Sequence, residues 1–195
     1  MVPATDLRAV LRAALDPDPS PEPGPGDRLA AVLAPLVERP EPSLVFTRRS
    51  IDLSRHAGEI SFPGGLQDPG ESLHETALRE TQEEIGLDPA TVEIVGAQPP
   101  VHTFVSGILV VPFVGVIERA PVFVPSAGEI DEVLMFPLAA LAAAERVVEI
   151  PRDDGRVWRG FAYEMEGHTI WGATGWMLRT LLETVRSEAS WLIPA

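Results

Sequence analysis

Three glutamates in one short segment carry the clearest chemistry in the chain. Glu80, Glu83 and Glu84 stand at i, i+3 and i+4, within a stretch free of proline and glycine from Glu71 to Ile85. In a helix this spacing places the three carboxylates on one face, where they repel one another by roughly 0.2–0.5 kcal/mol per pair. A hard divalent cation would reverse that repulsion, because Mg²⁺ and Mn²⁺ prefer carboxylate and water oxygens. The segment predicts either a metal-binding face or a solvated acidic face.

The flanking residues define the element that must position these carboxylates. Pro63-Gly64-Gly65 predicts a turn, because glycines adopt backbone angles closed to other residues. Gly86 supplies a helix stop. Between them, small or apolar side chains recur at helical spacing, at Leu73, Ala77, Leu78, Thr81 and Ile85. We therefore expect a loop, a helix of about four turns over Glu71–Ile85, and a turn.

The same stretch resembles the Nudix box, GX5EX7REUXEEXGU, in which U is a bulky aliphatic residue. All seven fixed positions match, at Gly65, Glu71, Arg79, Glu80, Glu83, Glu84 and Gly86. Thr81 departs from an aliphatic position, but it is β-branched and similar in volume. The resemblance implies an α+β fold, the Nudix α/β/α sandwich with a mixed β-sheet between helices.

The resemblance also implies a metal-dependent diphosphatase, an enzyme that hydrolyses phosphorus-containing anhydrides with Mg²⁺ or Mn²⁺. In such a site Glu80 and Glu84 ligate the metal, and the Gly65 carbonyl adds a ligand. Glu83 shares this ligation or deprotonates the attacking water. Arg79 orients the glutamates through ion pairs. The bound cation lowers the pKa of coordinated water and neutralises charge on the phosphate oxygens.

Three arginines and a histidine precede the acidic segment. Arg48, Arg49, Arg55 and His56 lie in TRRSIDLSRHAGEISFPGG, over residues 47–65. Guanidinium groups bind phosphates in a bidentate manner, so these side chains are candidate substrate ligands. The alternative is a set of surface arginines at the end of a strand.

This upstream stretch resembles the coenzyme A diphosphatases, a subfamily of Nudix hydrolases. Two positions depart from the subfamily pattern: Val45 replaces a leucine, and Ser54 occupies an arginine position, with Arg55 one place later. The positions that fit are Thr47, Arg49, Ser50, Gly58, Phe62, Pro63, Gly64 and Gly65. The implied reaction cleaves the diphosphate bond of coenzyme A or a derivative into 3′,5′-ADP and 4′-phosphopantetheine.

A second acidic group lies further along, at Glu129, Asp131 and Glu132. On a strand, Glu129 and Asp131 share one face and Glu132 points to the other. In many Nudix enzymes a carboxylate from this region completes the metal site or acts as base, and Glu129 is our candidate. The alternative is that Glu129 lies at a solvated strand end and has no role in the site.

Two other functions remain open at this stage. The chain could be a Nudix hydrolase of another nucleoside diphosphate derivative, such as ADP-ribose. It could also be a non-catalytic nucleotide-ligand sensor, although such proteins often lose a box glutamate and this chain keeps every one.

Composition narrows the possible partners. The 195 residues carry a formal charge of −14, which argues against nucleic acid or an anionic membrane surface as a partner. There is no cysteine, so disulfides and thiolate metal ligands are excluded. The uncharged stretch over residues 101–117 is interrupted by glycine and proline, which argues against a membrane span. A cytoplasmic location is the expectation.

The remaining helices and strands are predicted from the spacing of apolar residues and from the Pro and Gly residues that interrupt it. We expect helices from Thr5 or Asp6 to Leu15, over Arg28–Glu38, Leu138–Glu145 and Ala173–Glu188, and a Pro-rich loop over 16–27. Expected strands are Ser43–Arg49, Ile60–Phe62, Val92–Ala97, Phe104–Ile117 and Glu129–Phe136, and a hairpin joins Val147–Ile150 to Val157–Met165 across Asp153-Asp154-Gly155.

The domain organisation follows from these elements. Residues 1–42 would form N-terminal helices and the Pro-rich loop, packed on a Nudix hydrolase domain over 43–195. The apolar Trp191-Leu192-Ile193 could serve a homodimer contact.

Overall fold

The computed structural model describes residues 6–103, 107–151 and 157–193, and its largest element is a mixed eight-stranded sheet. The strands of this sheet are β1 Arg28–Arg39, β2 Ser43–Arg49, β3 Ile60–Ser61, β4 Gly64–Leu66, β5 Glu93–Ala97, β6 Val101–Thr103, β7 Ile108–Arg119 and β8 Ile130–Pro137. The order β3-β2-β1-β7-β5 forms its spine, while β4 pairs with β1, β6 with β7 and β8 with β2.

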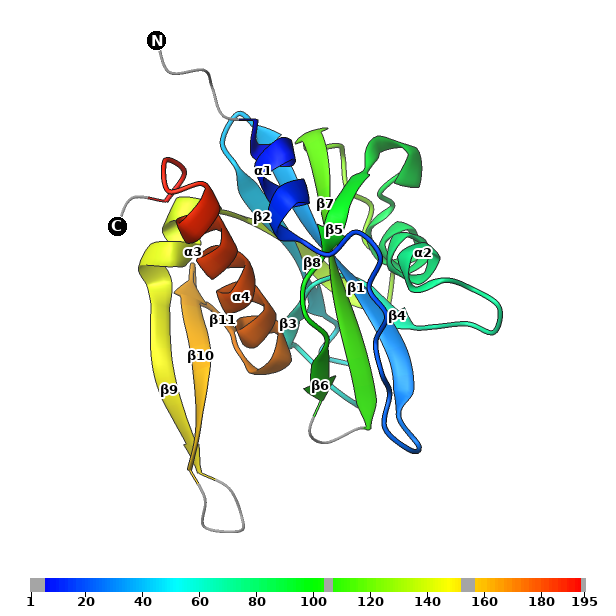
Figure 1. Cartoon of the computed structure of the whole chain (residues 1–195). Coiled ribbons are helices and arrows are strands. Elements are labelled where there is room, and N and C mark those ends of the chain that lie inside the picture. Colours follow the sequence, from blue (N-terminus) through cyan, green and yellow to red (C-terminus); the bar gives the residue numbers. More distant parts are fainter. Residues whose placement is uncertain (1–5, 104–106, 152–156, 194–195) are drawn as a thin grey trace.

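Helices cover both faces of this sheet, as Figure 1 shows. On one face lie α1 (Leu7–Ala14) and α4 (Gly172–Glu188), and on the other lies α2 (Leu73–Ile85). A short 3-10 turn, Pro89–Thr91, precedes β5, and α3 (Leu138–Ala144) follows β8. The α+β class and the sandwich of helices around a mixed sheet are therefore confirmed.

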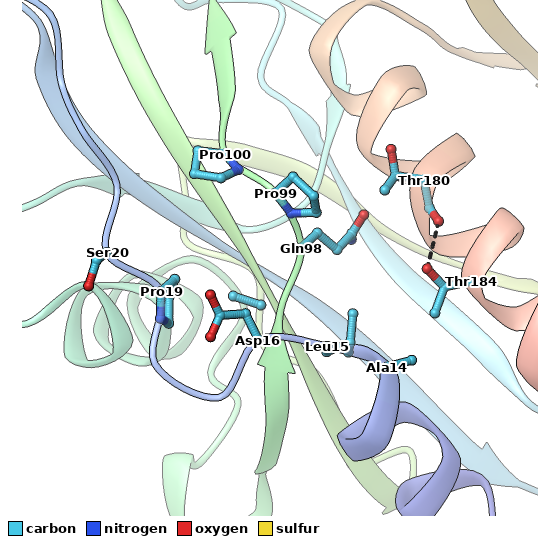
Figure 2. A pocket seen from close by; sticks show the side chains of 11 residues that line it. Ala14, Leu15, Asp16, Pro19, Ser20, Gln98, Pro99, Pro100, Thr180 and Thr184 are labelled. Carbon is cyan, nitrogen blue, oxygen red and sulfur yellow. Dashed lines mark hydrogen bonds between the residues drawn. The ribbon is translucent and has the colours of Figure 1, made fainter.

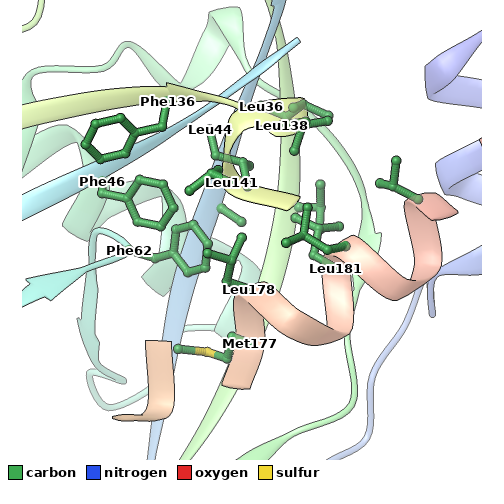
Figure 3. Close-up of a cluster of buried hydrophobic side chains, with 14 of the residues drawn as sticks. Leu36, Leu44, Phe46, Phe62, Phe136, Leu138, Leu141, Met177, Leu178 and Leu181 are labelled. Carbon is green, nitrogen blue, oxygen red and sulfur yellow. The ribbon is translucent and has the colours of Figure 1, made fainter. Parts of the chain in front are cut away.

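Each face of the sheet has its own hydrophobic core. On the α1 and α4 face, Phe46 of β2 stacks on Phe62 with ring centroids 4.7 Å apart, and Leu178 of α4 packs beside them (Figure 3). On the α2 face, Ala77 and Ile85 of α2 belong to the same buried cluster as Val45 of β2. Since Val45 and Phe46 are neighbours, the alternation of side chains along β2 separates the two cores.

The prediction of a helix over Arg28–Glu38 is wrong, because this segment is the central strand β1. Ala30 and Ala34 belong to one core and Ala31 and Leu33 to the other, so both faces of β1 are buried. Such a strand is a continuous apolar run, which periodicity alone cannot distinguish from a buried helix. A domain boundary at residue 43 would separate β1 from β2, to which it is hydrogen-bonded.

Pro35 fits inside β1 because of where its missing N–H would point. The N–H of Leu33 bonds to the Pro63 carbonyl, and residue 35 faces the same edge. On that edge β4 pairs with residues 30–32 of β1, and β2 pairs with residues 36 and 37. Pro35 lies between these two partners, so it removes no bond from either ladder.

A separate three-stranded sheet, β9 (Glu145–Pro151), β10 (Val157–Met165) and β11 (His168–Ile170), extends from the body of the molecule (Figure 1). Its anchor is the Glu145 carboxylate, which accepts hydrogen bonds from Arg179, Arg186 and the Tyr163 hydroxyl. The antiparallel pairing of β9 with β10 confirms the predicted hairpin strands. The predicted turn at Asp153-Asp154-Gly155 lies outside the described residues.

Most other predicted elements agree with the structure within a few residues. The exception is the strand predicted to begin at Phe104: β7 begins at Ile108, and residues 104–106 lie outside the described part. The predicted turn over Pro63-Gly64-Gly65 is wrong for its two glycines, which begin β4, and the short strands β6 and β11 lie outside the predicted strands. Of the C-terminal apolar residues, Trp191 is exposed but Ile193 is buried in the α4 core. In the described segments no helix combines the length and apolar composition that crossing a bilayer requires.

Candidate active site

Glu80, Glu83 and Glu84 form an acidic ridge on α2, and a capping box fixes the start of this helix. The Ser72 hydroxyl accepts from the Glu75 N–H, and the Glu75 carboxylate accepts from the Ser72 N–H, which is a capping box. The helix therefore starts at Leu73, two residues after the predicted start, and ends at Ile85, where the cap Gly86 has φ of 69°. The S-x-x-E pattern of this capping box is visible in the sequence at Ser72–Glu75.

The three glutamates of the ridge differ in burial. The Glu84 side chain is 4% exposed, that of Glu80 is 20% exposed, and that of Glu83 is 61% exposed. The Gly64 N–H donates to Glu84 at 3.3 Å. The ridge thus runs from solvent into the sheet.

The two glycines of β4 allow this close approach. A Cβ on Gly65 would lie 2.4 Å from the carboxylate carbon of Glu80, and one on Gly64 would lie 2.4 Å from the Ala31 carbonyl oxygen. Gly64 also has φ of 155°. β4 therefore presents bare backbone to the ridge, which places the Gly65 main chain against Glu80.

Arg79 joins the carboxylates of the ridge to the loop before it. Its Nη1 donates to Glu80 at 2.8 Å and to Glu83 at 3.2 Å. Its Nε and Nη2 donate to Glu71 at 2.9 and 3.1 Å, and Nη2 also reaches the Leu66 carbonyl. The guanidinium fork thus fixes the orientation of Glu80 from the side that faces the loop.

Arg49 and Glu129 approach the ridge from β2 and from the bend before β8. Arg49 lies 3.7 Å from Glu84 and 3.7 Å from Glu129, and its buried Nε has no partner among the described residues. Since Arg49 shares the face of Val45 on β2, it points to the α2 side. A cationic fork with an unused buried donor therefore lies between Glu84, the most buried ridge glutamate, and Glu129.

The predicted faces of the second acidic group are wrong. Arg48 donates to both Asp131 and Glu132, at 3.2 and 3.1 Å, so these two carboxylates lie together. The reason is a bulge: Arg48 pairs with Glu132 and Arg49 with Ile130, which leaves Asp131 as an extra residue in β8. Side chains therefore do not alternate between the two faces of the sheet across this bulge.

Three of the four predicted substrate ligands do not contact the ridge. Arg48 is bound to Asp131 and Glu132. Arg55 is exposed, with no ion pair among the described residues, and His56 is exposed and bonded to Glu59 at 2.8 Å. Arg49 is the one that the structure brings to the glutamates.

Burial and mutual repulsion raise the pKa of two ridge carboxylates, Glu80 and Glu84. Burial raises the pKa of Glu84 to about 8, against the opposing effect of Arg49 and with added repulsion from Glu129 and Glu80. Burial also raises the pKa of Glu80, although Arg79 opposes it. Without a cation Glu84 therefore holds a proton at neutral pH, which a metal ion would displace.

The donor set fits a hard divalent cation, but the ligands are not assembled. Within the described ranges no three carboxylate or imidazole groups already form a ligand set. Instead Arg79 holds Glu80 while Arg49 and the Gly64 N–H hold Glu84. The chemistry of the set, several carboxylates beside a glycine backbone, is that of Mg²⁺ or Mn²⁺ sites.

Comparisons with known proteins agree with this geometry. The NUDIX domain model matches residues 27–153. The chain belongs to the Nudix family. It is 41% identical over 159 residues to the uncharacterized Nudix hydrolase NudL of Escherichia coli strain SMS-3-5, covering 79% of this chain and 81% of that one. A NudL of Shigella boydii is 40% identical over the same shares.

Solved Nudix structures share the fold. The Nudix hydrolase RenU of M. smegmatis matches with a TM-score of 0.50 and 19% identity, over 60% of this chain and 74% of that one. A MutT/nudix family protein of Enterococcus faecalis matches with a TM-score of 0.52 and 16% identity, over 87% and 64%. The chain is thus a Nudix hydrolase, of a family that acts on phosphorus-containing anhydrides in small nucleoside diphosphate derivatives and requires divalent cations.

The departure from the Nudix box at Thr81 is accommodated within α2. Thr81 is 1% exposed, and its hydroxyl donates to the Ala77 carbonyl at 2.6 Å. The buried polar group is therefore paired, and the residue packs like the aliphatic one that it replaces.

Glu71 provides a test of the Arg79 contacts. The hydrogen bonds from Arg79 lower the pKa of Glu71 to about 2, against the opposing effect of burial. A lowered pKa stabilises the fold above the unfolded value of about 4.5, and this contribution disappears as the pH falls through the folded value. We expect Glu71→Gln to lower the free energy of unfolding at pH 7 by about 1–2 kcal/mol.

Denaturant unfolding at pH 7 and at pH 3 measures this effect. The difference between Glu71→Gln and the unchanged protein should shrink at pH 3. An equal difference at both pH values would contradict a contribution from the charged pair.

Proposed function

We propose that this Nudix hydrolase cleaves the diphosphate bond of coenzyme A or a derivative, giving 3′,5′-ADP and 4′-phosphopantetheine. One observation carries the proposal. Arg49, from the stretch that resembles the coenzyme A diphosphatases, lies against Glu84 of the Nudix box and against Glu129. The upstream stretch and the box therefore contribute to one site.

In this proposal Glu80 and Glu84 hold Mg²⁺ or Mn²⁺, with the Gly65 carbonyl and Glu83 as further ligands. A bound cation supplies an acidic water and neutralises charge on the phosphate oxygens. Arg79 holds Glu80 in place through the 2.8 Å hydrogen bond.

Two groups act on the substrate and the attacking water. Arg49 binds a phosphate of the diphosphate through its unused Nε and its two Nη groups. Glu129, half exposed at the rim of the site, accepts the proton of the attacking water.

Product analysis with coenzyme A and ADP-ribose side by side tests the substrate. We expect 3′,5′-ADP and 4′-phosphopantetheine from coenzyme A, with kcat/KM at least about tenfold above that for ADP-ribose, and no turnover in EDTA. Arg49→Met should raise KM for coenzyme A, whereas the same change at the exposed Arg159 serves as the control. A preference for ADP-ribose would refute the substrate, and turnover in EDTA would refute the metal site.

A further inference from the structure

A cleft lies on the side of the sheet that faces α4, away from the glutamates of α2. Its volume is about 490 Å³, within the range of about 300–1,000 Å³ that small-molecule sites occupy. Three elements form it: the chain that follows α1, the connection between β5 and β6, and α4 (Figure 2). The backbone bonds between Asp16 and Ala97, at 3.0 and 2.7 Å, fix the chain after α1 beside β5.

The side chain of Gln98 is the unusual feature of this cleft. Gln98 is 2% exposed, yet neither its Nε2 nor its Oε1 has a hydrogen-bond partner within the part of the chain that the structure describes. Its backbone N–H is paired with the Pro112 carbonyl, whereas both polar atoms of the side-chain amide lack a partner among the described residues. Figure 2 shows this amide extending toward Thr180 and Thr184 of α4. A buried amide without partners is costly, so a molecule that supplied it with a donor and an acceptor would be bound favourably.

The opposite wall offers hydrogen-bond acceptors. The Thr180 hydroxyl donates to the Trp176 carbonyl and the Thr184 hydroxyl to the Thr180 carbonyl, each at 3.1 Å. Both hydroxyl hydrogens are thus committed to the helix, which leaves oxygen lone pairs toward the cleft. A molecule in the cleft would therefore face a donor and an acceptor on Gln98 and acceptors on α4.

The remaining lining residues limit the charge and shape of that molecule. Pro19, Pro99 and Pro100 supply flat apolar walls, and Asp16 is the charged residue that lines the cleft. The lining contains no basic side chain, so a phosphate or carboxylate would meet no opposite charge and would face Asp16. The cleft thus excludes the diphosphate substrate of the active site.

We propose that this cleft is a second binding site, for a neutral, nucleobase-sized ring with an amide edge. The N–H and C=O of such an edge pair with Oε1 and Nε2 of Gln98, and the prolines pack against the ring. The site lies on the opposite face of the sheet from Glu84, so its occupancy and the hydrolytic reaction are separable.

Titrations of the full chain followed by ¹H–¹⁵N NMR test the site. The probes are nicotinamide, whose amide is a side group, and uracil, whose amide lies in the ring, with benzoate as a matched anion without a donor. The Gln98 side-chain amide, assigned by its loss in Gln98→Met, should shift with nicotinamide or uracil and not with benzoate. Which of the two binds more tightly identifies the kind of amide that the cleft accepts.

Gln98→Met preserves length and removes the amide, so it should weaken binding at least about tenfold. Its melting temperature should equal or exceed that of the unchanged protein, since an unpaired buried amide is lost, and its hydrolytic activity should be unchanged. The proposal fails if neither probe shifts Gln98 at up to about 10 mM, which detects millimolar dissociation constants. It also fails if benzoate binds equally, if Gln98→Met binds as before, or if a crystal soaked in the probe shows only water at Gln98.

Discussion

Glu84→Gln is expected to lower kcat at saturating Mg²⁺ by about 10²–10³-fold, the loss seen when one preorganised electrostatic contact is removed. Glu84 is the most buried of the three ridge carboxylates, and it contacts both Arg49 and the Gly64 N–H. Glutamine keeps the shape of the side chain and can still accept from Gly64, but it cannot supply a negative charge to a cation. The Mg²⁺ concentration that gives half-maximal activity should rise as well.

Steady-state kinetics across a Mg²⁺ titration measure this loss. The same change at Glu118, exposed near the end of β7, is the control and should leave both parameters unchanged. A circular dichroism melt close to that of the unchanged protein excludes misfolding. If Glu84→Gln kept kcat within a few-fold, the assignment of the ridge as the metal site would be wrong.

Glu129→Gln is the second large effect, and its kinetic pattern should differ. We expect kcat to fall by about 10²–10⁴-fold, the contribution of a general base. The Mg²⁺ dependence should stay unchanged, because in our proposal Glu129 takes the proton of the attacking water and is not a metal ligand. Its position supports this: the side chain is 47% exposed, beside Arg49.

Glu83→Gln, tested in parallel, separates the two candidate bases. If kcat fell little in Glu129→Gln and strongly in Glu83→Gln, the general base would be Glu83. A shift in the Mg²⁺ dependence of Glu129→Gln would instead make Glu129 a metal ligand.

The parts of the site that the sequence predicted well are those set by local spacing. The i, i+3, i+4 glutamates and the Gly86 stop depend on neighbours within a few residues, so a pattern in one segment contains them. The same holds for Arg79, whose partners Glu71, Glu80 and Glu83 all lie within one loop and helix. It does not hold for the turn predicted at Gly64-Gly65, because these glycines pair with β1 as part of β4.

Contacts across the sheet could not be obtained in this way. Arg48 and Arg49 are adjacent and alike in sequence, yet only Arg49 reaches the ridge, because β2 turns them to opposite faces. The bulge at Asp131 is defined by the pairing of β8 with β2, and no residue type in the sequence predicts it. The prediction of a helix at β1 is wrong for a related reason, since the burial of both faces of this strand depends on partners elsewhere in the chain.

The parallel pairing of β1 with β7 has a consequence for how the protein folds. Every residue of β1 in this ladder, from Arg28 to Arg39, is matched to one eighty positions later. Loops of that length close slowly compared with local helices and hairpins. The helix α2 can form early, but the sheet beneath it is complete only after β7 and β8 have been synthesised and joined. A nascent chain therefore gains its helix well before it gains catalytic competence.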